Sequence, residues 1–199
     1  DGHRPEGVLV VRTAAELTSP ELGALPTGRR VALFPIGSLE PHGPHLPLGT
    51  DEIISRAVAL AAVLPLEAVG ITAVVLPSLP YGVTEFASGF PGALSVPSAV
   101  LTAFIAAVVR SALADGFAHV CLVNNHLEPD HDAAVRSAMT GFAPGQVSVA
   151  SPLTRRWART LTDEFKRGAC HAGQYESSLI LFAAPALVRQ GLGGELPDL

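Results

Sequence analysis

A glutamate and a histidine lie two residues apart at two places in the sequence. The first pair is Glu40 and His42, and the second, in reverse order, is His126 and Glu128. In extended backbone, side chains two residues apart point to the same side, so each pair could bind one metal ion or two neighbouring ions. Asp51 adds a carboxylate able to bridge two cations. Because the ligand atoms are nitrogen and oxygen without sulfur, the set favours zinc, manganese or ferrous iron.

Each of these side chains has a simpler explanation when it is taken alone. A single histidine in a loop more often makes hydrogen bonds than binds a metal. Asp51 and Glu128 could each favour the positive end of a helix dipole. The occurrence of two equally spaced pairs together with a third carboxylate therefore carries the metal-binding interpretation.

A third polar cluster spans residues 171–178. His171 could act as a general acid or base, or it could cap a helix. Glu176 could bind metal, orient a ligand, or favour the dipole of the following helix. Cys170 beside His171 could be a nucleophilic thiol, but the sequence places no second histidine to activate it.

Several further side chains are weaker candidates. We interpret His45 and His131 as residues that support the metal ligands or that only stabilise the fold. The connection at residues 77–96 is long for a compact domain, and such loops are usually functional. Three of its polar residues could line a pocket: Tyr81, Glu85 and Ser88. Alternatively, three apolar residues simply pack this loop down: Phe86, Phe90 and Pro91.

Strands and helices are expected to alternate along the chain. Apolar runs and turn residues predict strands at 31–36, 71–76, 119–123 and 146–150, and helices beginning near 50 and spanning 97–114, 129–140, 154–165 and 175–181. This alternation is typical of an α/β fold with a parallel sheet. Because ligands collect at the carboxyl ends of parallel strands, the two Glu/His pairs should meet there.

Composition sets the class of protein. A chain of 199 residues fits a single domain, 1–199, and no internal repeat or linker divides it. Hydrophobic residues make up 48% and charged residues 16%, a balance that favours a sheet covered on both faces or a subunit that hides more surface in an oligomer.

Other classes of partner are not expected. The net charge of -5 and the lack of Lys/Arg runs argue against nucleic acid. The longest apolar stretch, 96–113, is interrupted by polar residues, which argues against a membrane span. Two cysteines, Cys121 and Cys170, make no disulfide framework, and no signal peptide is visible, so we expect a cytoplasmic protein.

Four ordered motifs resemble those of the creatininase family. Residues 37–51, GSLEPHGPHLPLGTD, are similar to the family's GSxEQHGPHLPLxTD. Residues 81–92 are similar to its YG...FPG loop, 124–126 to its NGH, and 171–178 to its HAGxxETS. The match runs over about residues 30–182, and four motifs at compatible intervals are far more specific than any one of them.

The resemblance implies a three-layer α/β/α sandwich, a dinuclear metal centre and a homo-oligomer, commonly a hexamer. Position by position, it implies that Glu40 and His126 bind one ion. His42 and Glu128 would bind the other ion, and Asp51 would bridge the two. Zinc is expected first, with manganese or iron as alternatives.

The resemblance also assigns supporting roles. His171 corresponds to the family's catalytic histidine, and Glu128 is a catalytic candidate as well as a ligand. The remaining candidates would support the ligands or line the substrate pocket: Glu176, His45, Tyr81, Glu85 and Asn125.

Departures from the family pattern bear on the substrate. Pro41 replaces a glutamine, Asn125 replaces a glycine, and Phe86 stands where many relatives have histidine. The pocket tryptophans of creatininase have no match, which argues against creatinine. We therefore expect hydrolysis of a C–N bond in a small-molecule amide or cyclic amide by a metal-activated hydroxide. The alternatives are a peptidase acting on a short peptide, a nonhydrolytic protein that binds metal or a small ligand, and an inactive structural subunit.

Overall fold

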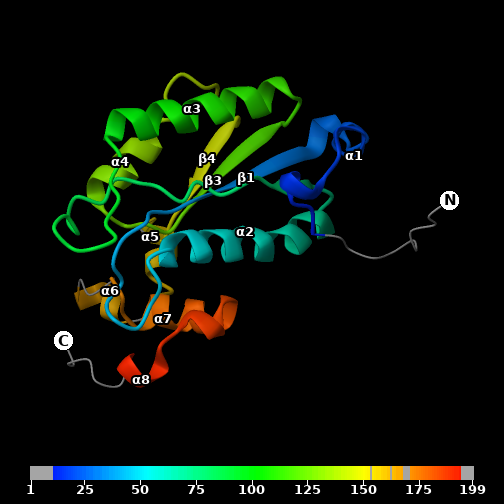
Figure 1. Ribbon diagram of the computed structural model, residues 1–199. Helices are drawn as coiled ribbons and strands as arrows, with labels where there is room; N and C mark the ends of the chain where they lie inside the picture. Colours follow the sequence, from blue (N-terminus) through cyan, green and yellow to red (C-terminus); the bar gives the residue numbers. More distant parts are fainter. Residues whose placement is uncertain (1–10, 153, 162, 168–170, 194–199) are drawn as a thin grey trace.

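A four-stranded parallel sheet forms the centre of the protein. The computed structural model describes residues 11–152, 154–161, 163–167 and 171–193 (Figure 1). The strand order is β2-β1-β3-β4. The strands span Arg30–Ile36 (β1), Thr72–Val75 (β2), His119–Asn124 (β3) and Val147–Ala150 (β4). Because all four run in the same direction, their carboxyl ends meet at one edge of the sheet.

The two central strands end level with each other. β1 pairs with β2 on one side and with β3 on the other, and the last pair of the β1–β3 ladder is Ile36 with Asn124. The chain runs outward from β1 to β2 and then crosses back to β3, so the strand order reverses between β1 and β3. Such a reversal opens a crevice beyond the strand ends. The loops that follow β1 and β3 leave the sheet side by side at this point.

Helices cover both faces of the sheet (Figure 1). α2, Thr50–Ala68, packs on one face, while α3, Ser98–Ala114, and α4, Pro129–Ser137, pack on the other. Alternate residues of β1 serve the two layers: Phe34 faces α3 and α4, whereas Leu33 faces α2. This arrangement confirms the predicted α/β sandwich.

Four short α-helices follow the sheet in the described part of the chain, and α7 packs beside α2. α5, Arg155–Ala158, and α6, Glu164–Arg167, precede α7, Gln174–Ala183, and α8, Gln190–Gly193, follows. Ile180 of α7 is fully buried in a small apolar cluster with Ile54 of α2 and Leu46. This packing brings the start of α7 to the carboxyl end of the sheet. None of the helices in these described segments has the length and apolar character needed to cross a membrane.

The boundaries differ from the predicted ones in three places. The helix expected at 154–165 is interrupted: the Thr160 hydroxyl donates to the Trp157 carbonyl at 2.7 Å, a local bond that competes with helix continuation. α4 ends at Ser137, before a turn in which Gly141 has φ +90°. α1, Ser19–Gly23, was not predicted although it carries a capping box formed by Thr18 and Glu21.

Candidate metal centre

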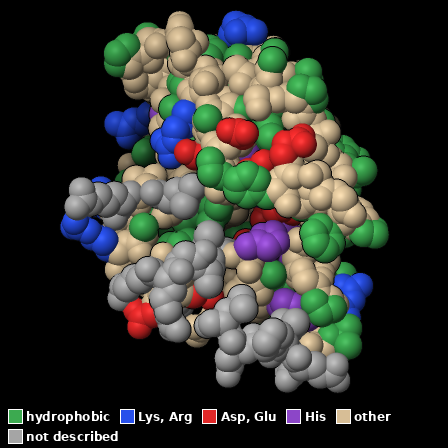
Figure 2. All heavy atoms as spheres, turned by 90° about the vertical axis from the view of Figure 1, so that its left-hand side faces the viewer, with side chains coloured by type: hydrophobic (Ala, Val, Ile, Leu, Met, Phe, Trp, Pro, Cys, Tyr) green, Lys and Arg blue, Asp and Glu red, His purple; other side chains and the backbone are tan. Residues whose placement is uncertain are grey.

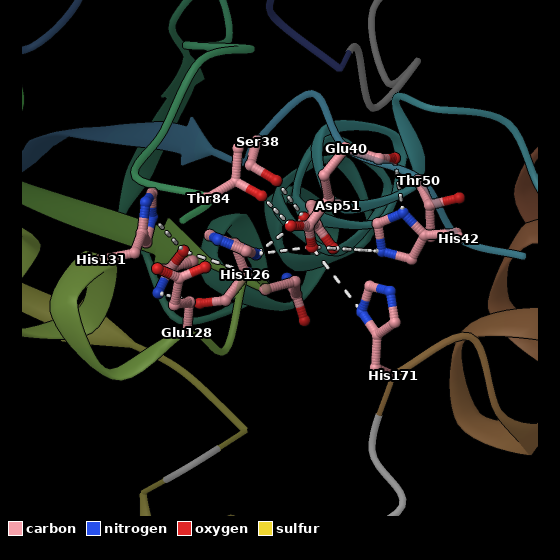
Figure 3. Close-up of polar contacts among 12 residues, drawn as sticks. Ser38, Glu40, His42, Thr50, Asp51, Thr84, His126, Glu128, His131 and His171 are labelled. Carbon is pink, nitrogen blue, oxygen red and sulfur yellow. Dashed lines mark hydrogen bonds and ion pairs between the residues drawn. The ribbon is translucent and has the colours of Figure 1, made fainter. Parts of the chain in front are cut away.

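Five candidate ligands converge beyond the carboxyl ends of β1 and β3 (Figure 3). Two follow β1, two follow β3, and one stands in the first turn of α2: Glu40, His42, His126, Glu128 and Asp51. All five are buried, with at most 6% of their surface exposed. The level ends of β1 and β3 explain this convergence, because each loop needs only a few residues to reach the crevice.

Asp51 lies between the two histidines. Its Oδ1 is 3.2 Å from His42 Nε2, and its Oδ2 is 3.0 Å from His126 Nδ1. The Ser38 hydroxyl donates to the same Oδ2 at 2.7 Å and helps to fix the carboxylate. Each carboxylate oxygen therefore faces a different imidazole, which is the geometry that a carboxylate bridging two cations requires.

Each histidine is held by a backbone carbonyl on its other nitrogen. His42 Nδ1–H donates to the Glu40 carbonyl at 3.1 Å, and His126 Nε2–H donates to the Val83 carbonyl at 2.7 Å. These bonds fix the ring orientations and leave His42 Nε2 and His126 Nδ1 directed at the carboxylates. Metal-binding histidines are commonly oriented in this way.

Three sets of side chains have ligand atoms within 4.8 Å of one another. They are Glu40, His126 and Glu128; His42, Asp51 and Glu176; and Glu40, His42 and His171. The resemblance implied that Glu128 pairs with His42 and that Glu176 only supports the site. In the structure Glu128 lies with Glu40 and His126, and Glu176 from α7 occupies the place beside His42, its Oε2 3.8 Å from Nε2.

A strap of four residues, Val83 to Phe86, contacts three of the ligands. Beyond the Val83 carbonyl on His126, the Thr84 hydroxyl donates to Glu40. The backbone N–H groups of Glu85 and Phe86 donate to the two oxygens of Glu128 at 3.0 and 3.2 Å. Residue types alone do not predict these contacts, because most of them use backbone groups, although the similarity of residues 81–92 to a family motif pointed to the segment.

His131 supports this strap from behind. Its Nδ1 accepts the Val83 N–H at 3.2 Å, and its Nε2–H donates to Asn124 Oδ1 at 3.1 Å. Burial, followed by the charge of His126, lowers the pKa of His131 to about 3, so it is a neutral hydrogen-bonding group. A Cβ on Gly82 would lie 2.4 Å from His131 Nδ1, which explains the glycine there.

Four of the predicted supporting or pocket residues are not part of the described lining of the cavity: His45, Asn125, Glu85 and Tyr81. His45 Nε2 lies 3.0 Å from Ser177 Oγ of α7. Asn125 accepts a hydrogen bond from the Tyr175 hydroxyl at 3.1 Å. The Glu85 carboxylate accepts one from Ser95 at 2.6 Å, and Tyr81 is 44% exposed. Of the two roles predicted for these residues, support of the ligands or lining of the pocket, these contacts favour support, and the assignment stays a prediction.

His171 stands at the edge of the cluster. Its side chain is about half exposed, and its Nε2–H donates to the Pro41 carbonyl at 2.9 Å. Its Nδ1 lies 3.7 Å from Glu40 Oε1, and its ring centroid is 4.4 Å from that of His42. One nitrogen therefore faces the cluster beside a route to solvent. Cys170, the candidate thiol, lies outside the described residues.

His42 and His126 act as cations toward the carboxylates. Burial opposes the charged form, but Asp51 and the other carboxylates outweigh it and raise the pKa of His42 to about 9. The pKa of His126 is raised well above its ordinary value in the same way, against burial, by Asp51 and Glu40. Burial and the charges of Asp51 and Glu40 outweigh His42 and raise the pKa of Glu176 to about 7.

Metal binding should therefore release protons. A metal ion needs the unprotonated imidazole, whereas at pH about 7.5 the raised pKa values keep His42 and His126 protonated. Affinity for zinc should rise with pH up to about 9, and calorimetric titration in two buffers of different ionisation enthalpy should report proton release. Zinc uptake without proton release would contradict the assignment of these histidines as ligands.

The cluster forms one side of a cavity of about 850 Å³. Its polar lining consists of Glu40, Asp51, His126, Glu128, His171 and Glu176. Its apolar lining consists of Pro41, Phe86, Ala87, Phe90, Pro91, Leu127 and Pro129. Figure 2 shows acidic, histidine and hydrophobic side chains gathered on one face of the molecule. The alternative in which Phe86 and Phe90 simply pack the loop down is wrong, since the two rings are 79% and 65% exposed.

Comparisons with known proteins agree on a single family. The family model described as "Creatininase: Creatinine amidohydrolase" matches residues 15–196. A mycofactocin precursor peptide peptidase of Mycolicibacterium smegmatis is 33% identical over 159 residues, which are 78% of this chain and 58% of the relative. A creatinine amidohydrolase of Pseudomonas putida is 34% identical over 119 residues, which are 57% of this chain and 44% of the relative. The chain thus spans about half the length of these two relatives.

Solved structures show the same fold. A creatininase named with manganese has a TM-score of 0.72, with 25% identity over 92% of this chain and 76% of that one. A mutant creatininase of the Zn-Zn type has a TM-score of 0.74 at the same identity and coverage.

Proposed function

Because the chain belongs to the creatininase family, we propose that it is a metal-dependent hydrolase that cleaves the C–N bond of an amide. The observation that carries this proposal is the position of Asp51, whose two oxygens face His42 and His126 separately. One divalent ion would be held on each side of the Asp51 carboxylate. The solved relatives named with manganese and with zinc support these metals as candidates.

The charges of the cluster fit such ions. Four carboxylates are buried together around two buried histidines: those of Glu40, Asp51, Glu128 and Glu176. Burying uncompensated negative charge is unfavourable, and two imidazolium groups balance only part of it. Two divalent cations, which would replace the imidazolium protons, would bring enough positive charge to balance all four carboxylates, and the nitrogen and oxygen donors suit zinc, manganese or iron.

The proposed mechanism gives each group of residues a role. Bound divalent ions would lower the pKa of a water molecule and polarise the amide oxygen. Asp51 would keep the two positions at a fixed separation, with Glu40, His126 and Glu128 on one side. His42 and Glu176 would complete the other side.

His171 would carry the proton to the departing nitrogen. Its Nδ1 faces the cluster, while the Pro41 carbonyl holds its Nε2–H and fixes the ring. Protonation of the leaving group is the step that allows the C–N bond to break, and a positioned histidine can supply it.

A short peptide is the second candidate substrate, beside the small or cyclic amide expected from the sequence. The Mycolicibacterium smegmatis relative, described as a peptide peptidase, favours it. A nonhydrolytic metal-binding protein of the same fold would keep the cluster and fail to cleave either kind of amide.

Metal content tests the proposal directly. Protein purified without added metal or chelator should contain about two divalent ions per chain by elemental analysis, in keeping with a two-metal site. Removal of the ions with a chelator should abolish amide hydrolysis, and addition of zinc or manganese should restore it. A metal-free protein that also fails to bind these ions on titration would contradict the proposal, and a metal-loaded protein without hydrolysis on a panel of amides, lactams and peptides would favour the nonhydrolytic alternative.

A further inference from the structure

Two exposed aromatic rings stand at the cavity. Phe86 and Phe90 are 79% and 65% exposed, yet both line the same cavity as the candidate metal ligands. Leu127, on the loop after β3, and Pro129, the first residue of α4, also line it. We call Phe86, Phe90, Leu127 and Pro129 the apolar wall. Exposed apolar groups that gather at a cavity mark a binding surface, and aromatic rings contribute most of the contact area there.

The apolar wall is directly connected to the metal-binding cluster. The Phe86 N–H donates to Glu128 Oε2 at 3.2 Å, so the residue that carries the ring is in direct contact with a candidate ligand. Leu127 stands between His126 and Glu128 in the sequence. A group that rests on these side chains would therefore lie next to an amide held at the cluster.

The loop that carries the rings is anchored although the rings are exposed. The Thr84 N–H donates to Ser95 Oγ at 3.1 Å, and the Val96 N–H donates to the Gly82 carbonyl at 2.9 Å. Farther along, the Leu94 N–H donates to the Leu39 carbonyl at 3.0 Å. A surface held in place before the ligand arrives loses less entropy on binding.

The other chemistry of the cavity limits what can bind. Among its described lining residues there is no lysine or arginine, and four carboxylates stand at the cluster. The described lining therefore offers no basic partner to an anionic substituent, which leaves apolar contact as the main interaction away from the cluster. A volume of about 850 Å³ lies near the upper end of the range for drug-sized ligands, which leaves room for a bulky substituent beside the amide.

We propose that the apolar wall binds an aromatic or large aliphatic side chain of a short peptide, next to the C–N bond that is cleaved. This inference rests on the proposed function, because the cluster is what places the scissile bond. Phe86 and Phe90 determine specificity, and their side chains take no part in holding the ligands of the cluster.

A pair of metal-binding probes isolates the contribution of the wall. Acetohydroxamic acid and phenylacetohydroxamic acid share a chelating group, but only the second carries a ring. With zinc-loaded protein, calorimetry should show about tenfold tighter binding of the phenyl compound, the effect expected from burying one aromatic side chain. The double variant Phe86→Ala/Phe90→Ala should reduce this preference to about twofold or less while its zinc content and its affinity for acetohydroxamic acid stay unchanged.

Phe182→Ala is the matched control. Phe182 is 85% exposed on α7 and does not line this cavity, so the variant removes an equally exposed ring and should keep the preference. A wild type without preference, or a double variant that retains it, would overturn the inference even if two zinc ions were bound. If the double variant kept the preference for the phenyl compound but differed from the wild type in oligomeric state, the rings would contact a second copy of the chain instead. Absence of zinc would overturn the proposed function, and the inference with it.

Hydrolysis distinguishes a peptide from a simple amide. The dipeptides Phe-Gly and Gly-Phe should be cleaved with a lower KM than Gly-Gly, and the double variant should remove this difference. Cleavage of phenylacetamide without cleavage of either phenylalanine dipeptide would overturn the assignment of a peptide substrate.

Discussion

Replacement of Asp51 by asparagine is expected to remove both metal ions. Even the outer partners of metal ligands are worth 10–100-fold in metal affinity, so loss of a direct ligand to two ions should weaken binding by more than about a hundredfold. Asparagine keeps the shape of the side chain but offers only one acceptor oxygen. It could face His42 or His126 but no longer both. Elemental analysis and activity of the purified variant measure the effect.

Asp132→Asn is the control for this change. Asp132 lies on α4, and its carboxylate pairs with Arg136 at 2.7 Å and belongs to none of the three ligand groups, so the same chemical substitution should leave the metal content unaltered. Circular dichroism and denaturant unfolding establish that both variants fold. Loss of one ion only in Asp51→Asn would rule out the bridging role and would assign Asp51 to a single ion.

The convergence of the ligands could be predicted from the sequence because it depends on simple geometry. Glu40 and His126 each come after an apolar strand, and parallel strands bring the loops at their carboxyl ends to one edge of the sheet. The structure adds the level ending of β1 and β3, Ile36 opposite Asn124, which residue types could not specify. Register depends on the packing of both faces of the sheet.

The strap of residues 83–86 could not be predicted in the same way. Val83, Glu85 and Phe86 contact His126 and Glu128 through backbone groups, which every residue possesses. Only the folded path of the loop gives these groups a function. The exposure of Phe86 likewise depends on the folded path of the loop, whereas its apolar character suggested burial.

The place of Glu176 shows how tertiary packing alters a local interpretation. Its position at the start of a helix fits the dipole explanation, and the resemblance made it a supporting residue. Packing of Ile180 against Ile54 brings the first turn of α7 beside α2. Glu176 is thereby buried next to His42, where it is a candidate ligand. The single domain, the hexamer and the cytoplasmic location stay predictions.

Replacement of His171 by alanine is expected to lower turnover by about 10²–10⁴-fold while the metal content stays near normal, since this is the usual contribution of a positioned general acid. His171 is about half exposed, and its Nδ1 is 3.7 Å from Glu40, so it stands beside the buried ligands without being enclosed by them. Removal of the ring should leave the interior of the cluster intact. Steady-state kinetics on a cleaved amide, together with elemental analysis, measure the two quantities separately.

Two further experiments separate proton transfer from metal binding at His171. His119→Ala removes a histidine at the start of β3 whose ring contacts Gly145 and Ser148, and this control should keep full turnover. Added imidazole should restore part of the activity of His171→Ala, because a diffusing base can replace a missing proton carrier.

Because His171 also groups with Glu40 and His42 within ligand distance, the loss of one ion per chain in His171→Ala would instead make it a ligand. Unchanged turnover would exclude both roles, and the proton for the departing nitrogen would then have to come from another group, such as one of the four carboxylates that line the cavity.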